Sequence, residues 1–253
     1  TRWGLGACLA DDMGLGKTIQ TLALLQRHKN AGGKPVLLVC PTSVIENWRR
    51  ELERFAPHLR YLIHHSLGRK KGADFIRHCA AVDVVFTSYA LLGRDAPILG
   101  EVTWGGVVLD EAQNIKNPET RTAQAARQLV AGFRVALTGT PVENSVGDLW
   151  SLFAFLNPGL LGSRAAFERR YLTPIQRGQD REAADRLRRL SGPFVLRRLK
   201  TDRTLVEELP EKVERDVFCH LTREQASLYR AVTEETAEAL ATADGVALRG
   251  LAL

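Results

Sequence analysis

The sequence predicts an α/β fold in which a parallel β-sheet is sandwiched by helices, and two observations support this. Short apolar runs alternate with segments of helical periodicity from residue 6 to residue 138. Several of the short runs are apolar at every position, as expected of strands that are covered on both faces. A strand–helix–strand order of this kind favours parallel strands joined by crossover helices.

The expected elements follow one another from the N-terminus. The expected strands are residues 6–10, 36–40, 60–64, 82–87, 107–110 and 134–138. The expected helices between them are residues 17–28, 44–55, 73–80 and 119–130. The helix at 44–55 carries a capping box, Ser43 with Glu46. It also carries one apolar stripe, made of Val44, Ile45, Trp48, Leu52 and Phe55.

The alternation stops after Pro141, and helical periodicity continues at residues 146–156, 163–171 and 183–190. Residues 176–180 form a polar break within these helices, and a last helical run starts at Arg223. We therefore predict an α/β lobe over 1–160 and a helical insertion over 161–195. Residues 196–253 are expected to form the end of this lobe and a connector to a second lobe. The chain would contain only the beginning of that second lobe.

Composition argues against a membrane protein and a metal centre. The 253 residues are 45% hydrophobic, but no apolar run reaches about 18 residues and the N-terminus has no signal pattern. The four cysteines, Cys8, Cys40, Cys79 and Cys219, are far apart and lack metal-ligand spacing, so they are expected in the core. We expect no membrane contact and a cytoplasmic, nucleoid-associated location.

The net charge of +6 is concentrated in one segment. Residues 164–203 hold 12 Lys and Arg against 5 Asp and Glu. Contact with a polyanion such as nucleic acid is one interpretation, because basic side chains release counterions from phosphates. A solvated helix face is the alternative.

A phosphate-binding loop follows the first expected strand and opens the first expected helix. It reads Asp11-Asp12-Met13-Gly14-Leu15-Gly16-Lys17-Thr18, with Asp11 in place of the usual first glycine. Gly14 and Gly16 would let backbone N–H groups close around the β-phosphate, and Lys17 would reach the β- and γ-phosphates. Thr18 would place its hydroxyl on Mg²⁺. Residues 12–18 are therefore the predicted nucleotide-binding residues.

Two adjacent carboxylates end the apolar strand at 107–110, in the sequence Asp110-Glu111-Ala112-Gln113. Such a strand end faces the crevice of a parallel sheet. Asp110 would join the Mg²⁺ shell, and Glu111 would orient and deprotonate the water that attacks the γ-phosphate. ATP and Mg²⁺ are therefore the expected cofactors.

A third apolar strand ends in Thr138-Gly139-Thr140-Pro141. In this order, the three motifs resemble those of the superfamily-two helicase-like ATPases, and more narrowly the N-terminal ATP-binding lobe of Swi/Snf-type translocases of the bacterial type. Further similar motifs are Pro41-Thr42-Ser43 with Trp48, Thr87-Ser88-Tyr89, Phe155-Leu156-Asn157-Pro158, Leu196-Arg197-Arg198-Leu199-Lys200-Thr201-Asp202, Leu209-Pro210-Glu211-Lys212, and Leu221-Thr222 with Gln225 and Tyr229. The resemblance implies a P-loop (RecA-like) sheet and a DEAQ box at 110–113.

The resemblance also implies roles for individual residues. It assigns contacts with the DNA backbone to Thr42, Ser43, Thr87, Ser88 and Tyr89, with strand-end capping as the alternative. Thr138, Gly139 and Thr140 would couple hydrolysis to movement, and Gln113 would sense the γ-phosphate. For Arg197, Arg198 and Lys200 three partners stay open, namely DNA, a second lobe and water.

The expected function is that of a double-stranded DNA translocase or remodeller that hydrolyses ATP. A strand-separating helicase is one alternative, and a non-hydrolysing nucleotide- or DNA-binding module is another. The Gln-x-x-Gly-Arg-x-x-Arg segment with which the family's second lobe completes catalysis does not occur in the 253 residues. We therefore expect the isolated chain to be nearly inactive and monomeric. Double-stranded DNA is the expected partner, with RNA polymerase or another DNA-bound protein as the expected target of a longer protein.

Overall fold

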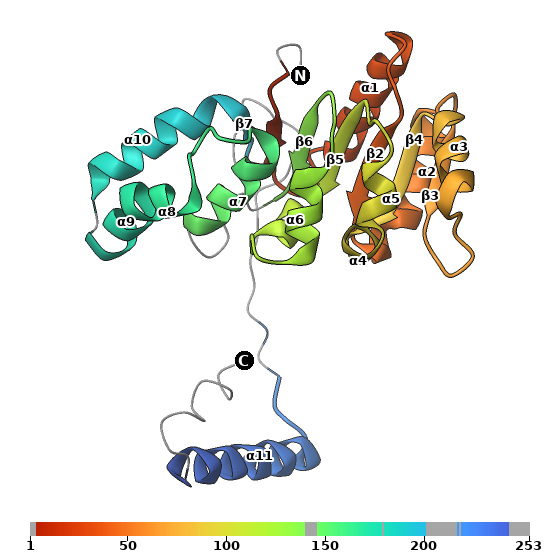
Figure 1. Ribbon diagram of the computed structural model, residues 1–253. Helices are drawn as coiled ribbons and strands as arrows, with labels where there is room; N and C mark the ends of the chain where they lie inside the picture. The colour runs from red at the N-terminus through yellow and green to blue at the C-terminus, as the bar shows by residue number, and fades with distance from the viewer. Residues whose placement is uncertain (1–3, 140–145, 179, 201–216, 218, 243–253) are drawn as a thin grey trace. The chain divides into compact units, whose positions relative to one another are not determined.

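The computed structural model describes residues 4–139, 146–178, 180–200, 217 and 219–242 (Figure 1). The chain forms two compact units, Thr1–Glu207 and Glu208–Leu253. The first unit contains the sheet and most helices, and the second contains α11 (Arg223–Thr242), where a helical run was predicted. The predicted boundaries at residues 160 and 195 stay predictions.

The first unit is built on one sheet of seven parallel strands in the order β3-β4-β2-β5-β6-β1-β7 (Figure 1). Six strands confirm the predicted ones: β1 (Ala7–Leu9), β2 (Val36–Cys40), β3 (Tyr61–His64), β4 (Val84–Ser88), β5 (Gly106–Asp110) and β6 (Arg134–Leu137). The seventh, β7 (Val195–Leu196), was not predicted, because two residues are too short to show a period.

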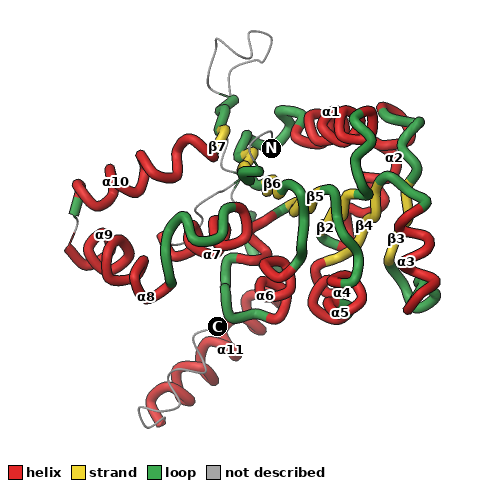
Figure 2. The backbone as a smooth tube through the Cα atoms, turned by 45° about the horizontal axis from the view of Figure 1, so that its top comes forward, coloured by secondary structure: helices red, strands yellow, loops and turns green. Residues whose placement is uncertain are grey.

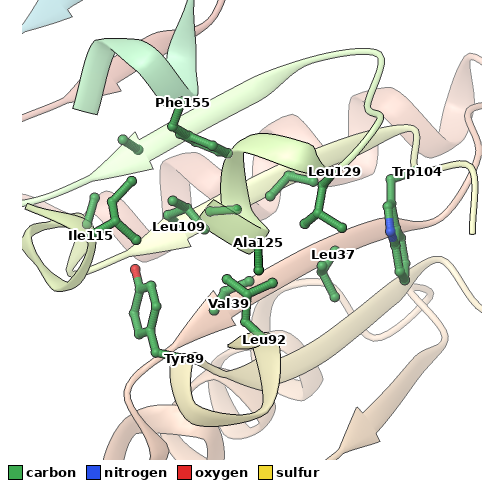
Figure 3. Close-up of a cluster of buried hydrophobic side chains, with 14 of the residues drawn as sticks. Leu37, Val39, Tyr89, Leu92, Trp104, Leu109, Ile115, Ala125, Leu129 and Phe155 are labelled. Carbon is green, nitrogen blue, oxygen red and sulfur yellow. The ribbon is translucent and has the colours of Figure 1, made fainter. Parts of the chain in front are cut away.

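Helices cover both faces of this sheet (Figure 2). On one face lie α1 (Lys17–Asn30) and α2 (Ile45–Phe55), whose buried side chains pack on Val36, Leu38 and Val108. The opposite face carries α3 (Gly72–Ala80), α4 (Tyr89–Arg94), α5 (Ala96–Gly100), α6 (Arg121–Gln128) and α7 (Val146–Leu156). Their side chains pack on Leu37, Val39 and Leu109. Figure 3 shows this for Leu92 of α4, Ala125 of α6 and Phe155 of α7. Successive residues of the central strands thus enter two different cores, which confirms the predicted sandwich.

A helical appendage packs against α7. It consists of α8 (Arg164–Phe167), a π-helix (Glu168–Leu172), α9 (Thr173–Gly178), α10 (Arg181–Ser191) and a 3-10 turn (Gly192–Phe194). Its own apolar core joins Leu149 and Phe153 of α7 to Phe167, Tyr171 and Leu187. The polar break predicted over 176–180 begins later than expected, since α9 continues to Gly178 and α10 begins at Arg181.

Two local predictions for α2 were also wrong. A 3-10 turn (Thr42–Val44) precedes this helix, so its N-cap is Val44 and no side chain caps it. Glu46 instead receives a hydrogen bond from Arg49 at 2.9 Å. Phe55 is 49% exposed and leaves the apolar stripe, because it is the last residue of the helix.

Three of the four cysteines lie in the core, where burial raises the pKa of Cys8, Cys40 and Cys79 to about 12. Cys219 is exposed, contrary to the prediction. Among the helices that the structure describes, none combines the length and hydropathy that crossing a membrane requires.

Asn157 ties the end of α7 to the residue before β1. Its side chain is buried, accepts a hydrogen bond from Gly6 N at 2.9 Å and donates one to Gly6 O at 3.1 Å. The two segments approach so closely that a Cβ on Gly6 would lie 2.4 Å from Leu156 O. The backbone of Gly6 therefore depends on one side chain far along the chain.

Asn157→Ala is expected to lower the free energy of unfolding by about 3 kcal/mol, because two buried backbone groups lose their partners. Urea unfolding followed by circular dichroism measures this. Asn30→Ala, at an exposed helix end, is the matched control and should change stability by less than about 0.5 kcal/mol. Equal effects of the two substitutions would contradict this role of Asn157.

Candidate active site

The phosphate loop, the Asp110–Glu111 pair and the Thr138 motif all lie at the carboxyl ends of neighbouring strands of the sheet. Strand β6 lies between β1 and β5, and Leu137 pairs with both Leu9 and Asp110. Thr138 N donates a hydrogen bond to Leu9 O at 3.1 Å. The phosphate loop, the two carboxylates and the Thr138 motif therefore follow adjacent parallel strands, as predicted for a crevice at their carboxyl ends.

The phosphate loop has the backbone that its glycines allow. Gly14 and Gly16 have φ angles of +85° and +77°, which side chains disfavour. Gly16 is the N-cap of α1, so the N-terminus of a 14-residue helix opens onto the loop. Lys17 Nζ donates hydrogen bonds to Asp11 O at 2.6 Å and Asp12 O at 3.3 Å. The loop thus places an ammonium group and a helix N-terminus together, which suits an anion.

Asp110 is held by two neighbours at the end of β5. Its Oδ2 accepts a hydrogen bond from Trp48 Nε1 at 2.7 Å, and its Oδ1 accepts one from Glu111 N at 3.0 Å. Burial raises the pKa of this carboxyl above its ordinary value. The hydrogen bond from Trp48 and the positive charge of Lys17 lower that pKa, but they do not outweigh burial. The strand order β5-β6-β1 likewise places Asp110 and the loop of Lys17 at neighbouring strand ends.

Glu111 begins a chain of hydrogen bonds that reaches β6. Its φ of +51° is unusual for a residue with a side chain. Gln113 Nε2 donates to Glu111 Oε2 at 2.8 Å, and Thr138 Oγ1 donates to Gln113 Oε1 at 2.9 Å. A Cβ on Gly139 would lie 3.8 Å from Met13 Cγ of the phosphate loop. The Thr138 motif thus touches both other motifs, while Thr140 lies outside the described residues.

The predicted DNA-contact residues divide into two groups. Thr42 and Ser43 are exposed, in the turn after β2. Thr87 and Ser88 are buried, where Thr87 Oγ1 donates to His64 O at 3.1 Å and Ser88 Oγ caps α4. Buried Tyr89 donates its hydroxyl to Asp110 O at 2.7 Å. The hydroxyl groups of these last three side chains thus have internal partners, in line with the capping alternative, and their contact with DNA stays a prediction.

Two polar contacts of the site were not predicted. Trp48 was identified as a residue of an apolar stripe, although a buried indole N–H needs an acceptor. Asp11 was noted only as a replaced glycine. It is fully buried, and its carboxylate accepts hydrogen bonds from Arg198 Nε at 3.0 Å and from Arg198 N at 3.0 Å. A buried carboxylate at a strand end is the signal that a partner must exist.

The chain matches the family described as SNF2-related domain over residues 2–249. It is 46% identical to the putative ATP-dependent helicase/translocase YwqA of Bacillus subtilis, over 99% of this chain and 27% of that protein. It is 32% identical to the TATA-binding protein-associated factor MOT1 of Saccharomyces cerevisiae, over 92% of this chain and 14% of that protein. The relatives are thus several times longer than the matched part.

Solved structures agree with these similarities. The SWI2/SNF2 ATPase core of Sulfolobus solfataricus in complex with dsDNA is 45% identical and superposes with a TM-score of 0.76. That match covers 99% of this chain and 52% of the other. The expected family resemblance and the parallel α/β fold are both confirmed.

Proposed function

This chain belongs to the SNF2-related domain family, and we propose that it is the nucleotide-binding lobe of an ATP-dependent motor that moves along double-stranded DNA. The observation that carries the proposal is the placement of the phosphate loop and the Asp110–Glu111 pair after β1 and β5, on either side of β6. This arrangement provides one group for the phosphates and another for the attacking water.

The residues of the loop and of β5 fit a nucleotide with Mg²⁺. The described residues contain no cluster of three or more His, Cys, Asp or Glu side chains that could hold a metal ion by themselves. Mg²⁺ at such sites uses one or two carboxylates together with substrate phosphates, and Asp110 and Thr18 are the proposed ligands. Bound there, Mg²⁺ would neutralise charge on the phosphate oxygens. Residues 12–18 would hold those phosphates.

Glu111 is the proposed general base, and its neighbours give the base a fixed direction. The amide of Gln113 holds one carboxylate oxygen, and Thr138 holds that amide in turn. A change in the nucleotide that moves Glu111 would therefore reach the strand end of β6 through two hydrogen bonds. We propose that Thr138, Gly139 and Thr140 couple hydrolysis to movement by this route, with Gln113 as the sensor.

DNA is the proposed partner. The structure supports contacts through Thr42 and Ser43, because both are exposed after β2, whose carboxyl end lies at the same sheet edge as the nucleotide motifs. The Sulfolobus solfataricus relative is a complex with dsDNA. A cytoplasmic, nucleoid-associated location, a monomeric state and a DNA-bound protein as the target belong to the same proposal.

Trp48→Phe is expected to lower the kcat for ATP hydrolysis of a longer protein that contains this chain by about tenfold, because Asp110 loses a hydrogen bond that fixes its carboxylate. Trp104→Phe is the matched control. Trp104 is equally buried and donates its indole N–H to Leu99 O at 2.8 Å, away from the site. A kcat that falls equally in both variants would contradict the role given to Trp48.

The proposed function is tested with the longer protein, by steady-state ATP hydrolysis with and without duplex DNA and by a strand-release assay. We expect duplex DNA to stimulate hydrolysis without release of a labelled strand. Release of that strand would establish the alternative of a strand-separating helicase. Absence of ATP hydrolysis under both conditions would leave a nucleotide- or DNA-binding module.

A further inference from the structure

The segment after β7 runs beside the phosphate loop. Strand β7 pairs with β1, and the pairing continues beyond both strands. Ala10 N donates a hydrogen bond to Leu196 O at 2.7 Å, and Asp12 N donates one to Arg198 O at 3.1 Å. Residues 196–200 therefore accompany the chain from the end of β1 into the loop.

Arg198 provides the charge that buried Asp11 needs. Its Nε lies 3.1 Å and 3.0 Å from the two Asp11 oxygens, and its Nη2 also contacts Asp11 Oδ2. Burial alone would raise the pKa of the Asp11 carboxyl, but hydrogen bonds from Arg198 and Gln20 outweigh it and lower that pKa below its ordinary value. The pair is a charge-assisted, forked contact of the kind that fixes geometry.

The same guanidinium reaches the loop by a second path. Arg198 Nη2 donates a hydrogen bond to Gln20 Oε1 at 2.7 Å. Gln20 Nε2 donates to Leu15 O, between the two loop glycines, at 3.1 Å. Arg198 thus joins the strand end, the loop and the first turn of α1.

Lys200 brings a second ammonium group to the loop. Its backbone N donates a hydrogen bond to Asp12 Oδ2 at 3.0 Å. A Cβ on Gly14 would lie 3.1 Å from Lys200 Nζ. In the described part of the chain no carboxylate forms an ion pair with this ammonium group. Within the described residues the charge therefore lies beside the phosphate loop without an ion-pair partner.

We propose that Arg198 and Lys200, in the segment that follows β7, are part of the nucleotide site. Arg198 is a positioning residue that sets the phosphate loop through Asp11, and Lys200 is a second cation, besides Lys17, for the phosphates of a nucleoside triphosphate. This inference rests on the proposed nucleotide binding. It adds that the phosphate loop is held by the segment from which the chain continues toward the second compact unit.

The test is the Kd of the 253-residue chain for a fluorescent ATP analogue with Mg²⁺. Arg198→Gln is expected to weaken binding by about 30-fold, because the forked contact is lost and a buried carboxylate stays unpaired. Adding Asp11→Asn in the same chain removes that unpaired charge and should restore Kd to within about threefold of the wild type. Lys200→Ala should weaken binding by about tenfold and reduce the dependence of Kd on salt.

Matched controls separate positioning from general stability. Arg197→Gln removes the neighbouring exposed arginine and should leave Kd unchanged. Asn157→Ala, which destabilises the fold away from the loop, should leave Kd within about twofold in the folded protein. Arg198→Lys keeps a cation beside Asp11 and replaces the glutamine variant if that variant does not fold. It should give an intermediate Kd.

The outcomes distinguish this inference from the function on which it rests. If the wild-type chain does not bind the analogue, or if Lys17→Ala binds it equally well, the proposed function fails. If Lys17→Ala abolishes binding while Arg198 and Lys200 variants bind like Arg197→Gln, only the inference fails. A double variant that binds no better than Arg198→Gln would also overturn the role given to the Asp11–Arg198 pair.

Discussion

Lys17→Ala is expected to weaken binding of Mg²⁺ and ATP by at least about 100-fold, since it removes the charged donor on which phosphate loops depend. Lys17 Nζ lies 2.6 Å from Asp11 O, within the phosphate loop that opens α1. ATP hydrolysis by a longer protein should fall with binding. Titration with a fluorescent analogue and a steady-state ATPase assay measure the two effects.

Lys29→Ala is the matched control for this prediction. Lys29 lies near the end of the same helix and forms an ion pair with Asp83 at 3.0 Å. The substitution should alter stability slightly and leave the nucleotide Kd unchanged. An ATPase rate that survives Lys17→Ala would contradict the catalytic assignment of the loop.

Glu111→Gln is expected to separate binding from turnover. The side chain keeps its size, so the Gln113–Thr138 network and the phosphate loop stay in place, but it no longer accepts a proton from the attacking water. Loss of a general base lowers kcat by about 10²- to 10⁴-fold. The Kd for the analogue should stay within about threefold of the wild type, because the loop makes the phosphate contacts.

Glu119→Gln provides the comparison, since Glu119 is exposed and pairs with Arg164 outside the site. Its kcat should equal that of the wild-type protein. A Glu111→Gln variant with unchanged kcat would exclude Glu111 as the base. Loss of binding together with turnover would show that Glu111 has a structural role instead.

The central sheet was predictable because each of its longer strands is a short apolar run that can be recognised from its own residues. Strand β2 is apolar at every position, and each of its residues is buried. Strand β7 was missed for the opposite reason, because its two residues gain their strand conformation only by pairing with β1. The helices α4 and α5 are six and five residues long, too short for a clear helical period.

The site was predictable where its residues are consecutive. The phosphate loop and the Asp110–Glu111 pair each carry their chemistry within one short segment, next to a strand. The contacts that hold them are not local. Trp48 lies 62 residues from Asp110, and Arg198 lies 187 residues from Asp11. No periodicity or spacing connects residues so far apart, so only the fold reveals these contacts.

The DNA-contact prediction shows a different limit. It assigned Thr87, Ser88 and Tyr89 from a resemblance, which specifies the position of a motif but not the exposure of its side chains. In the fold these hydroxyl groups satisfy His64 O, the N-terminus of α4 and Asp110 O. Buried polar groups need such partners, and that requirement gives the three residues a structural role.

The most direct test of the account is ATP binding and hydrolysis by the 253-residue chain, measured side by side with and without duplex DNA. We predict Mg²⁺-dependent binding of the nucleotide without DNA-stimulated turnover. The reason is that the chain has the phosphate loop and the carboxylates but no Gln-x-x-Gly-Arg-x-x-Arg segment, and an arginine finger contributes about 10³ to 10⁵ in rate. Absence of nucleotide binding, or turnover that duplex DNA stimulates, would contradict the account.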